Sequence, residues 1–421
     1  MGMDRIAETT HTDVAVIGAG LAGLTAARIA QRNGASVVVL DGQPAGGRAR
    51  TDQIDGFAFN RGPHALYSGG AAERIFGELG VQITGGPPAN ESFGLLDGRI
   101  DRLPGNARTL LTTHLVGFRA KAALGKLLGG MSKWDAGAVA HLTVREWIDD
   151  MQLPSDAALV VEMLVRVSTY GNAPDVMSAQ VAVAQIQMAL RSGVRYLDGG
   201  WQTLVDQLAG GVDIRRDQAV SVHHDGEQVV IGTATDGHVV ADAVVVASGT
   251  PASMAGLLGR QPFDVGPPIE AACLDLGVAV VPRHPVLFGV DVPLYASVHC
   301  PPARLAPAGM RLLAVARYLA ADDALPPADQ RAELQAHALR TGVTDADIVA
   351  SRYLHRMTVV GAVSTAAAGG YDGRVQVGDA GVDGVFLAGD WIGREGHLAD
   401  ASVASAAEAA RLATARVRAR A

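Results

Sequence analysis

The sequence Asp13-Val14-Ala15-Val16-Ile17-Gly18-Ala19-Gly20-Leu21-Ala22-Gly23 decides the fold of this chain. Its apolar run at 14–17 is typical of a buried parallel strand, and apolar residues at helical spacing follow the glycines directly. Asn33-Gly34 then ends the helix, and a second apolar run at 36–40 stops at Asp41. We therefore predict a complete βαβ unit, with a carboxylate 21 residues after Gly20.

The glycines of this unit fit G-x-G-x-x-G, a pattern in which each glycine has its own physical task. Gly18 permits the tight turn, Gly20 lets the backbone approach a pyrophosphate, and Gly23 lets helix and strand pack closely. The helix N-terminus offers unpaired N–H groups to phosphates. Asp41 is suited to accept hydrogen bonds from ribose hydroxyls. The alternative, a glycine-rich turn in an ordinary α/β protein, is disfavoured by the full order of strand, helix, strand and acid.

The bulk composition is that of a globular protein with a large core. The chain has 421 residues, of which 48% are hydrophobic and 19% charged, and this length favours two domains. Its formal net charge is −8, and only residues 411–420 form a basic block, so we expect a small-molecule substrate and no nucleic-acid partner. The oligomeric state stays open at this stage, with a homodimer as one option.

Cysteine usage and hydropathy favour a cytoplasmic location. The two cysteines, Cys273 and Cys300, suggest neither a disulfide framework nor a metal site. Residues 1–11 look like a flexible leader without an apolar signal core, and no apolar run reaches the roughly 18 residues that a membrane-spanning helix needs. Residues 110–133 interleave apolar and basic side chains. A core-facing helix with a solvated basic side is the simpler interpretation, and peripheral membrane contact is the other.

Two further segments resemble parts of a cofactor site. Residues 44–51 form a second glycine-rich turn, in which Arg48 is suited to pair with phosphate; a surface hairpin is the alternative. Residues 56–66 suggest a short strand followed by a Gly62-Pro63 turn and then His64. A lone histidine is more often a structural hydrogen-bonding group than a catalyst, so a catalytic role for His64 is a hypothesis.

The pattern DVAVIGAGLAGLTAA…VVVLD…GGRART…F.FNRGPHAL resembles the FAD-dependent superfamily of amine oxidases, phytoene desaturases and protoporphyrinogen oxidases. Members usually carry Glu where this chain has Asp41. The resemblance implies that the glycine-arginine turn lies along FAD and that the segment after Gly62-Pro63 approaches the flavin ring. The C-terminal phrase AGDW.G…LADAS.AS, residues 388–405, is similar to the phytoene-desaturase-like branch. There Asp390 is suited to bond the ribityl or phosphate end of FAD, and the last helix directs its N-terminus at the flavin.

Together, the motifs and the resemblance predict a set of cofactor-binding residues. Val220 belongs to it because related flavoproteins meet the adenine with the backbone at that position. The full set is Gly18, Ala19, Gly20, Leu21, Ala22, Gly23, Asp41, Gly42, Gly46, Gly47, Arg48, Gly62, Pro63, His64, Val220, Gly389, Asp390, Leu398, Ala399 and Ala401.

The predicted fold class is α/β, with a Rossmann-like FAD-binding domain and an α+β substrate domain inserted discontinuously. We assign residues 1–70, 195–264 and 376–421 to the FAD-binding domain, and residues 71–194 and 265–375 to the substrate domain. Helical patterns dominate 71–195, including one at 110–128 and one at 142–151 that starts with a capping box of Thr143 and Glu146. Strands are expected at 238–240, 244–247, 274–281, 286–290 and 312–318. Polar or polarisable candidates for the substrate cavity are Tyr295, His299, Tyr318, Arg356 and Met357.

The chemistry follows from what the resemblance supplies and what this chain lacks. No paired catalytic carboxylates, nucleophile elbow or metal cluster is evident. Many amine oxidases place a lysine in the substrate domain near flavin N5, but the three lysines here all lie in 121–133. Covalent attachment often uses a cysteine near the C-terminal motif, and none lies beyond Cys300. We therefore expect non-covalent FAD and hydride removal from a lipophilic or cyclic small molecule, of desaturase or dehydrogenase type. Amine or protoporphyrinogen oxidation, non-redox isomerisation and a binding role remain alternatives.

Overall fold

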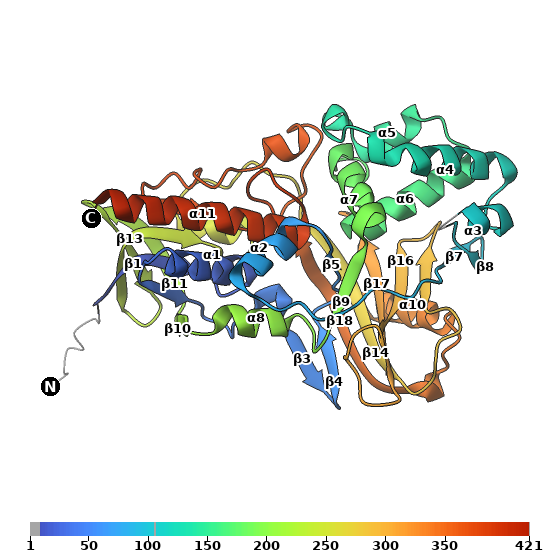
Figure 1. Cartoon of the computed structure of the whole chain (residues 1–421), viewed down its shortest axis with the longest axis horizontal. Coiled ribbons are helices and arrows are strands. Elements are labelled where there is room, and N and C mark those ends of the chain that lie inside the picture. Colours follow the sequence, from blue (N-terminus) through green and yellow to red (C-terminus); the bar gives the residue numbers. More distant parts are fainter. Residues whose placement is uncertain (1–8, 105–106, 421) are drawn as a thin grey trace.

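The computed structural model describes residues 9–104 and 107–420. Two large sheets organise these residues, each covered by its own helices (Figure 1). The first sheet has the order β10 (Asp213–Arg215), β2 (Val37–Leu40), β1 (Thr9–Ile17), β13 (His238–Val246), β12 (Gln228–Thr233) and β11 (Ala219–Asp225), and β19 (Val385–Leu387) pairs with β13. The second has the order β18 (Ile348–Val360), β14 (Ile269–Val278), β17 (Arg311–Leu319), β16 (Leu294–Cys300), β15 (Val286–Gly289), β7 (Phe93–Leu96) and β8 (Arg99–Arg102).

The predicted βαβ unit is confirmed at the centre of the first sheet. β1 pairs in parallel with β2 and β13, with Val16 opposite both Val39 and Val245. The helix between β1 and β2 is α1 (Leu21–Arg32). Residues 14–17 of β1 are almost fully buried, which explains why they are continuously apolar rather than alternating.

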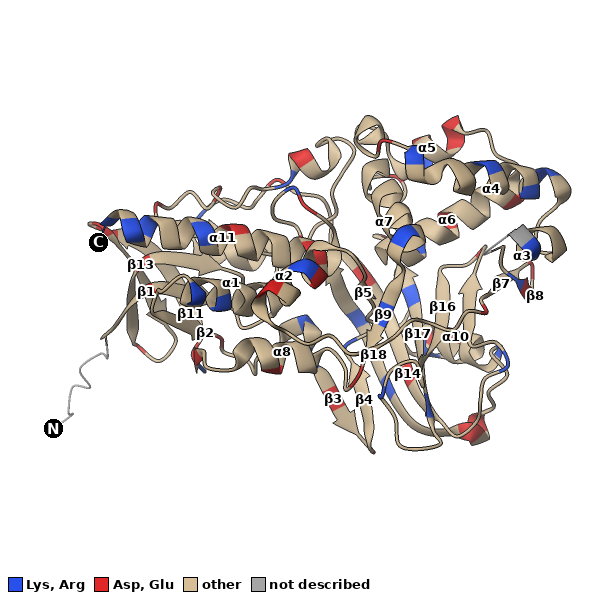
Figure 2. Cartoon of the chain, in the orientation of Figure 1, with Lys and Arg blue, Asp and Glu red and all other residues tan. Residues whose placement is uncertain are grey.

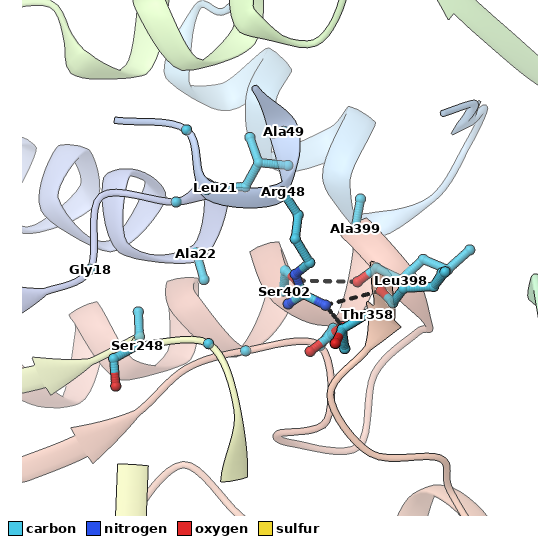
Figure 3. Close-up of a pocket in the computed structure, with 18 of the residues that line it drawn as sticks. Gly18, Leu21, Ala22, Arg48, Ala49, Ser248, Thr358, Leu398, Ala399 and Ser402 are labelled. Atoms are coloured by element: carbon cyan, nitrogen blue, oxygen red, sulfur yellow. Dashed lines mark hydrogen bonds and ion pairs between the residues drawn. The ribbon is translucent and has the colours of Figure 1, made fainter. Parts of the chain in front are cut away.

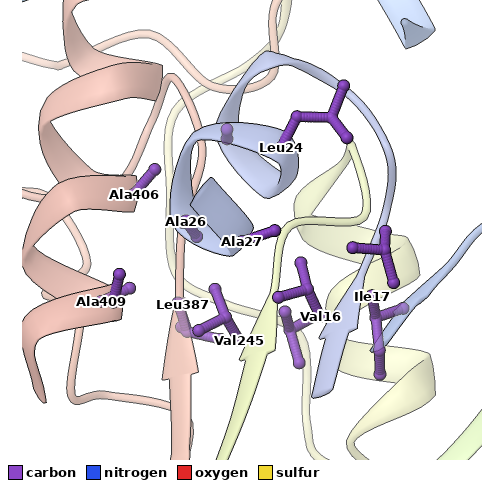
Figure 4. Packing of buried hydrophobic residues seen from close by; sticks show 14 of the residues in the cluster. Val16, Ile17, Leu24, Ala26, Ala27, Val245, Leu387, Ala406 and Ala409 are labelled. Atoms are coloured by element: carbon purple, nitrogen blue, oxygen red, sulfur yellow. The ribbon is translucent and has the colours of Figure 1, made fainter. Parts of the chain in front are cut away.

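Alanine-rich helices cover this sheet. The last helix, α11 (Leu398–Arg420), packs against α1 and β13. Figure 4 shows Ala26 and Ala27 of α1 facing the sheet residues and Ala406 and Ala409 of α11, and all four side chains are fully buried. Small side chains let the two helices approach closely, so the two ends of the chain share one core. Of the remaining helices, α2 (Ala71–Leu79) packs against α11, α8 (Gln202–Ala209) against α1, and α9 (Pro251–Leu257) against β11.

The second sheet is mainly antiparallel, with β15 and β7 as its parallel pair. Its helices are α3 (Ala107–Thr112), α4 (Phe118–Gly130), α5 (Val144–Asp150), α6 (Ser155–Thr169), α7 (Ala179–Ser192) and α10 (Pro327–Leu339). The hairpin of β3 (Thr51–Ile54) and β4 (Phe57–Asn60) and the small sheet of β5 (Leu66–Tyr67), β9 (Val194–Leu197) and β6 (Gly85–Gly86) complete the strands. The α/β fold class is thereby confirmed, whereas the exact domain boundaries stay a prediction.

Several local predictions were wrong. The leader was expected to extend to residue 11, but β1 begins at Thr9, because residues 9–12 pair with the start of β13; residues 1–8 lie outside the described part. The expected helix at 110–128 is two helices, α3 and α4, separated at residues 113–117, where Gly117 precedes α4. The expected strands at 238–240 and 244–247 are one strand, β13, with residues 241–243 inside it. The strands β7, β8, β16 and β18 were not predicted.

No helix in the described part of the chain is both long enough and apolar enough to span a bilayer.

Candidate cofactor and substrate site

A cavity of about 830 Å³ runs from the glycine turn of the first sheet to the inner face of the second. Most of the predicted cofactor residues line it: Gly18, Gly20, Leu21, Ala22, Asp41, Gly42, Gly46, Gly47, Arg48, Gly62, Pro63, His64, Val220, Gly389, Asp390, Leu398 and Ala399. Ala19, Gly23 and Ala401 are not on its surface, because they lie behind the lining and pack the elements that form it. Their contacts with the cofactor, like those of the lining residues, stay predictions.

The glycine turn has the geometry that its sequence predicts. Gly18 has φ of +105°, which favours glycine. A Cβ on Gly23 would lie 1.8 Å from the carbonyl oxygen of Gly18, so only glycine allows helix and turn to pack this closely. A Cβ on Gly20, in contrast, would meet no protein atom within 4 Å, although Gly20 lines the cavity. The open space over Gly20 at the start of α1 therefore fits a phosphate group.

Asp41 connects the end of β2 to this turn. Its Oδ2 accepts a hydrogen bond from Ala19 N at 2.7 Å, and its Oδ1 accepts one from Gln43 N at 2.8 Å. These bonds orient the carboxylate, which also lines the cavity. Each carboxylate oxygen has a second lone pair, so both can still accept bonds from ribose hydroxyls.

Arg48 lines the cavity and pairs with an acid of the C-terminal motif. Gly46 N donates to Ala19 O at 2.7 Å, which places the glycine-arginine turn beside the glycine turn of β1. From there Arg48 Nη1 reaches Asp390 Oδ2 at 2.6 Å and Val359 O at 3.0 Å (Figure 3). Only Nη1 is used in these two bonds, so the expected contact of Arg48 with a phosphate stays a prediction. The pair links an N-terminal turn to the C-terminal motif.

The C-terminal motif presents Asp390 and the start of α11 to the cavity. Asp390 is 2% exposed, and its Oδ1 has no hydrogen-bond partner among the described residues. A buried carboxylate oxygen without a donor is costly, so a hydroxyl-bearing ligand fits this position. Leu398, which has φ of +54°, and Ala399 line the cavity at the N-terminus of α11. That helix end favours negative charge, such as a reduced flavin carries.

His64 is held as a neutral imidazole. Its Nδ1 lies 2.9 Å from Gly62 O, and its ring contacts Trp201 edge-on at 5.0 Å between centroids. Burial lowers the pKa of His64 to about 4. With the Nδ1 proton donated to the carbonyl, Nε2 carries the free lone pair at neutral pH. The low pKa makes His64 a weak base, so it is suited to accept a hydrogen bond, and a catalytic role stays a hypothesis.

The side of the cavity contributed by α6 and the second sheet, the substrate-side wall, bears no charged side chain among the described residues. Tyr170, directly after α6, has φ of +56°, a costly conformation for a tyrosine that places it at the cavity. Cys273 Sγ lies 3.4 Å from Met357 Sδ. The wall consists of Tyr170, Ala271, Cys273, Met357, Thr358 and Val359.

Only Met357 among the five polar cavity candidates from the sequence lines the cavity. Tyr295, His299 and Tyr318 are buried behind the wall, where Tyr196 OH bonds Tyr295 OH at 3.1 Å. Arg356 instead pairs with Glu270. Sequence reasoning missed Tyr170, Ala271 and Cys273. Ala271 and Cys273 alternate along β14, so a period-of-two analysis would have placed them on one face once β14 was known to border the cavity.

The residues present fit FAD. The cavity begins at a turn that is open for phosphate, passes an oriented carboxylate and a buried oxygen that lacks a donor, and ends at a helix N-terminus beside an uncharged wall. Asp41, Gly20 and Asp390 would hold the adenosine, phosphate and ribityl parts, respectively.

Comparison with known proteins agrees with this fit. The family model for flavin containing amine oxidoreductases matches residues 21–272, more than half of the chain. The chain therefore belongs to this family of FAD-dependent oxidoreductases.

Solved structures share the fold over almost the whole chain. Wild-type putrescine oxidase bound to putrescine has a TM-score of 0.74 at 17% identity, covering 96% of this chain and 99% of that chain. Cyclohexylamine oxidase from Brevibacterium oxydans IH-35A has a TM-score of 0.70 at 16% identity, covering 97% and 99%. An oxidoreductase from Methanosarcina mazei has a TM-score of 0.74 at 17% identity, covering 94% and 99%. At these identities the likeness shows the fold alone.

One curated relative matches a short segment. Sarcosine oxidase subunit alpha from Corynebacterium sp. (strain U-96) is 60% identical over 50 residues, which are 11% of this chain and 5% of that protein. The match thus spans a small fraction of the relative's length.

Proposed function

We propose that this protein removes a hydride from a neutral lipophilic or cyclic small molecule, as a desaturase or dehydrogenase does. The observation that carries the proposal is the substrate-side wall, which offers tyrosine, alanine, sulfur and hydroxyl groups and no charge. A charged substrate group buried against such a wall would lose its hydration without a partner, at a cost of several kcal/mol. The wall therefore favours substrates without charge.

FAD, when bound, supplies the hydride acceptor at its N5 atom. The chain's own part is to bind the substrate, exclude water and receive the proton. Tyr170, Cys273 and Met357 provide contact surface for an apolar substrate. His64, which lines the cavity as a neutral imidazole because burial lowers its pKa to about 4, is the group that we propose takes up the proton leaving the substrate as the double bond forms, and it does so as a weak base.

Non-covalent FAD and a cytoplasmic location are parts of the same proposal. Cys273 and Cys300 are both free and buried, which agrees with a reducing compartment. Acid precipitation of the protein should leave the yellow colour in the supernatant; colour that stays with the pellet would contradict non-covalent binding. Fractionation of the source cells, with the protein followed by immunoblot, tests the location.

Oxidation of an amine is the second candidate, because putrescine oxidase and cyclohexylamine oxidase share the fold. The two candidates differ in the substrate group that lies against the substrate-side wall, which is neutral in the first and an amine in the second. None of the three lysines lines the cavity. The carboxylate of Asp400 does line it and accepts one hydrogen bond, from Ala72 N at 2.7 Å, so its remaining lone pairs are suited to an ammonium group and favour this candidate.

Anaerobic mixing separates the candidates. The holoenzyme is mixed with pairs of matched compounds, such as a cyclohexene or cyclohexanone derivative and the corresponding cyclohexylamine, and the loss of visible flavin absorbance is followed. We expect reduction by members of the neutral series and none by the amines. Reduction by the amines alone would contradict the proposal and support the second candidate.

A further inference from the structure

Besides the basic block at 411–420, a longer segment of this acidic protein has only basic residues among its charged residues. Residues 102–134 contain no Asp or Glu, although the formal net charge of the whole chain is −8. All three lysines of the chain lie in this segment. Its cations are Arg102, Arg108, Arg119, Lys121, Lys126 and Lys133. Such a concentration of one sign of charge on an otherwise acidic protein points to an anionic partner.

The same segment carries the most exposed large apolar side chains in the described part of the chain. Phe118 is 85% exposed and Leu111 is 74% exposed. Leu111 lies near the end of α3, and Phe118 is the first residue of α4. A single exposed apolar residue is ordinary, but two of them beside cations form the combination that interfacial membrane segments use.

Contacts in the structure hold these residues together. Lys121 Nζ donates to Leu111 O at 2.9 Å, which joins the start of α4 to the end of α3. Phe118 and Lys121 are three residues apart and therefore lie on the same side of α4. Arg119 and Lys126 are exposed and make no ion pair with any described residue. Figure 2 shows the basic residues along α4, at the end of the molecule opposite α11.

We propose that this surface, the α3–α4 patch of Leu111, Phe118, Arg119, Lys121 and Lys126, docks the protein on the surface of an anionic lipid bilayer. Leu111 and Phe118 enter the boundary between headgroups and acyl chains, and the cations approach lipid phosphates. Arg119 and Lys126 are available for phosphate without breaking an ion pair in the protein, whereas Lys121 also donates to Leu111 O. Protruding apolar side chains favour a bilayer over a nucleic acid, whose binding rests on phosphate contacts and stacking.

The patch is also connected to the cavity. α4 packs on α6, and Tyr170, the residue after α6, lines the substrate-side wall. The reason why docking would be useful rests on the proposed function. A lipophilic substrate dissolves in the bilayer, and docking through α4 would hold the substrate domain against the membrane that contains it.

Flotation with lipid vesicles tests the docking directly. The FAD-loaded full chain is mixed with vesicles of phosphatidylcholine and phosphatidylglycerol in equal parts, or of phosphatidylcholine alone. We expect binding to the anionic vesicles that weakens as salt is raised, because each cation near an anionic surface contributes about fivefold to the partition coefficient. Equal binding to both vesicles, or to neither, would overturn the proposal.

Matched variants locate the surface. Leu111→Ser/Phe118→Ser and Arg119→Glu/Lys126→Glu should each weaken vesicle binding by about tenfold or more. Val281→Ser removes an apolar side chain that is 71% exposed elsewhere, and Arg411→Glu reverses an exposed charge on α11; both should bind like the wild type. Unchanged binding in the patch variants, or a salt-sensitive affinity for duplex DNA with no vesicle binding, would overturn the assignment.

The readout separates this inference from the proposed function. Flotation measures membrane binding without turnover. If the protein oxidises amines and still floats with anionic vesicles, the docking proposal is supported and the proposed substrate class is contradicted. If neutral compounds reduce the flavin and the protein does not bind vesicles, the proposed substrate class is supported and the docking proposal is contradicted.

Discussion

At the residue scale, Asp41 was predicted as a ribose ligand, and the structure adds a second task. Its carboxylate accepts the N–H of Ala19 inside the glycine turn as well as lining the cavity. The sequence pattern of a strand ending in an acid identified Asp41. Its hydrogen bond to Ala19 N could not be predicted in the same way, because it depends on β1 and β2 pairing side by side.

We expect Asp41→Ala to weaken FAD binding by about tenfold or more, because hydrogen bonds to a charged group are worth about 1.5–3 kcal/mol. Titration of the flavin-free protein with FAD measures this. Asp13→Ala is the matched control, since its carboxylate accepts Ser36 N at 2.7 Å and lies away from the cavity. FAD affinity that is equal in Asp41→Ala and Asp13→Ala would refute the assignment.

Buried histidines should make the protein sensitive to acid. Burial lowers the pKa of His337 to about 4 from its ordinary 6.5. The unfolded chain then binds the proton more readily than the folded one, so the stability present above pH 6.5 is lost as pH falls toward 4. His64 and His397 act in the same direction, whereas Asp275 and Asp400, whose pKa burial raises to about 6, oppose it.

Between roughly pH 8 and pH 5 the free energy of unfolding should fall by about 2 kcal/mol less in His337→Gln than in the wild type. His337 is 1% exposed and lies outside the cavity, so the change reports stability and not cofactor binding. Urea unfolding at the two pH values measures it. An identical pH dependence in variant and wild type would show that His337 does not titrate in this way.

At the scale of elements, the sequence predicted those features that depend only on residues close together in the chain. The glycine turn, the flanking strands and the capping box of α5 were all predicted, because each depends on a few neighbouring residues. The strands β16 and β18 were missed because their residues do not alternate clearly between apolar and polar. Their pairing with β17 and β14 is long-range and leaves no local pattern.

The capping box offers a test at this scale. Thr143 Oγ1 accepts Glu146 N at 3.1 Å, and Glu146 Oε2 accepts Thr143 N at 2.8 Å. We expect Thr143→Ala to lower the free energy of unfolding by about 1 kcal/mol, and Thr143→Ser to leave it nearly unchanged. Chemical denaturation measures both. Equal losses in the two variants would mean that the hydroxyl does not cap α5.

At the scale of the whole molecule, Arg352 connects the second sheet to the β3–β4 hairpin. It lies on β18 and pairs with Asp275 of β14 at 2.6 Å and with Asp52 of β3 at 2.9 Å, and it donates to Phe59 O at 2.9 Å. No sequence signal marked it, because its partners come from separate segments. The same holds for the substrate-side wall, whose residues meet only when α6, β14 and β18 are placed.

We expect Arg352→Met to lower the free energy of unfolding by about 3–5 kcal/mol, because it leaves Asp275 buried without its cation. Arg352→Met/Asp275→Asn should recover part of that loss. Arg304→Met is the matched control, since Arg304 is 83% exposed in its pair with Asp198. A loss below about 1 kcal/mol in Arg352→Met, the usual value for an exposed pair, would contradict the role of this connection.

The central prediction is that FAD lies in the cavity with its phosphates over Gly20. Gly20→Ala tests it, because the added Cβ would meet no protein atom within 4 Å but would stand in the cavity. Gly77→Ala, an open helical glycine outside the cavity, is the control. We predict that Gly20→Ala folds with an unchanged melting temperature in the flavin-free form and purifies without yellow flavin, while Gly77→Ala keeps it. Gly20→Ala with full flavin occupancy would contradict the claim.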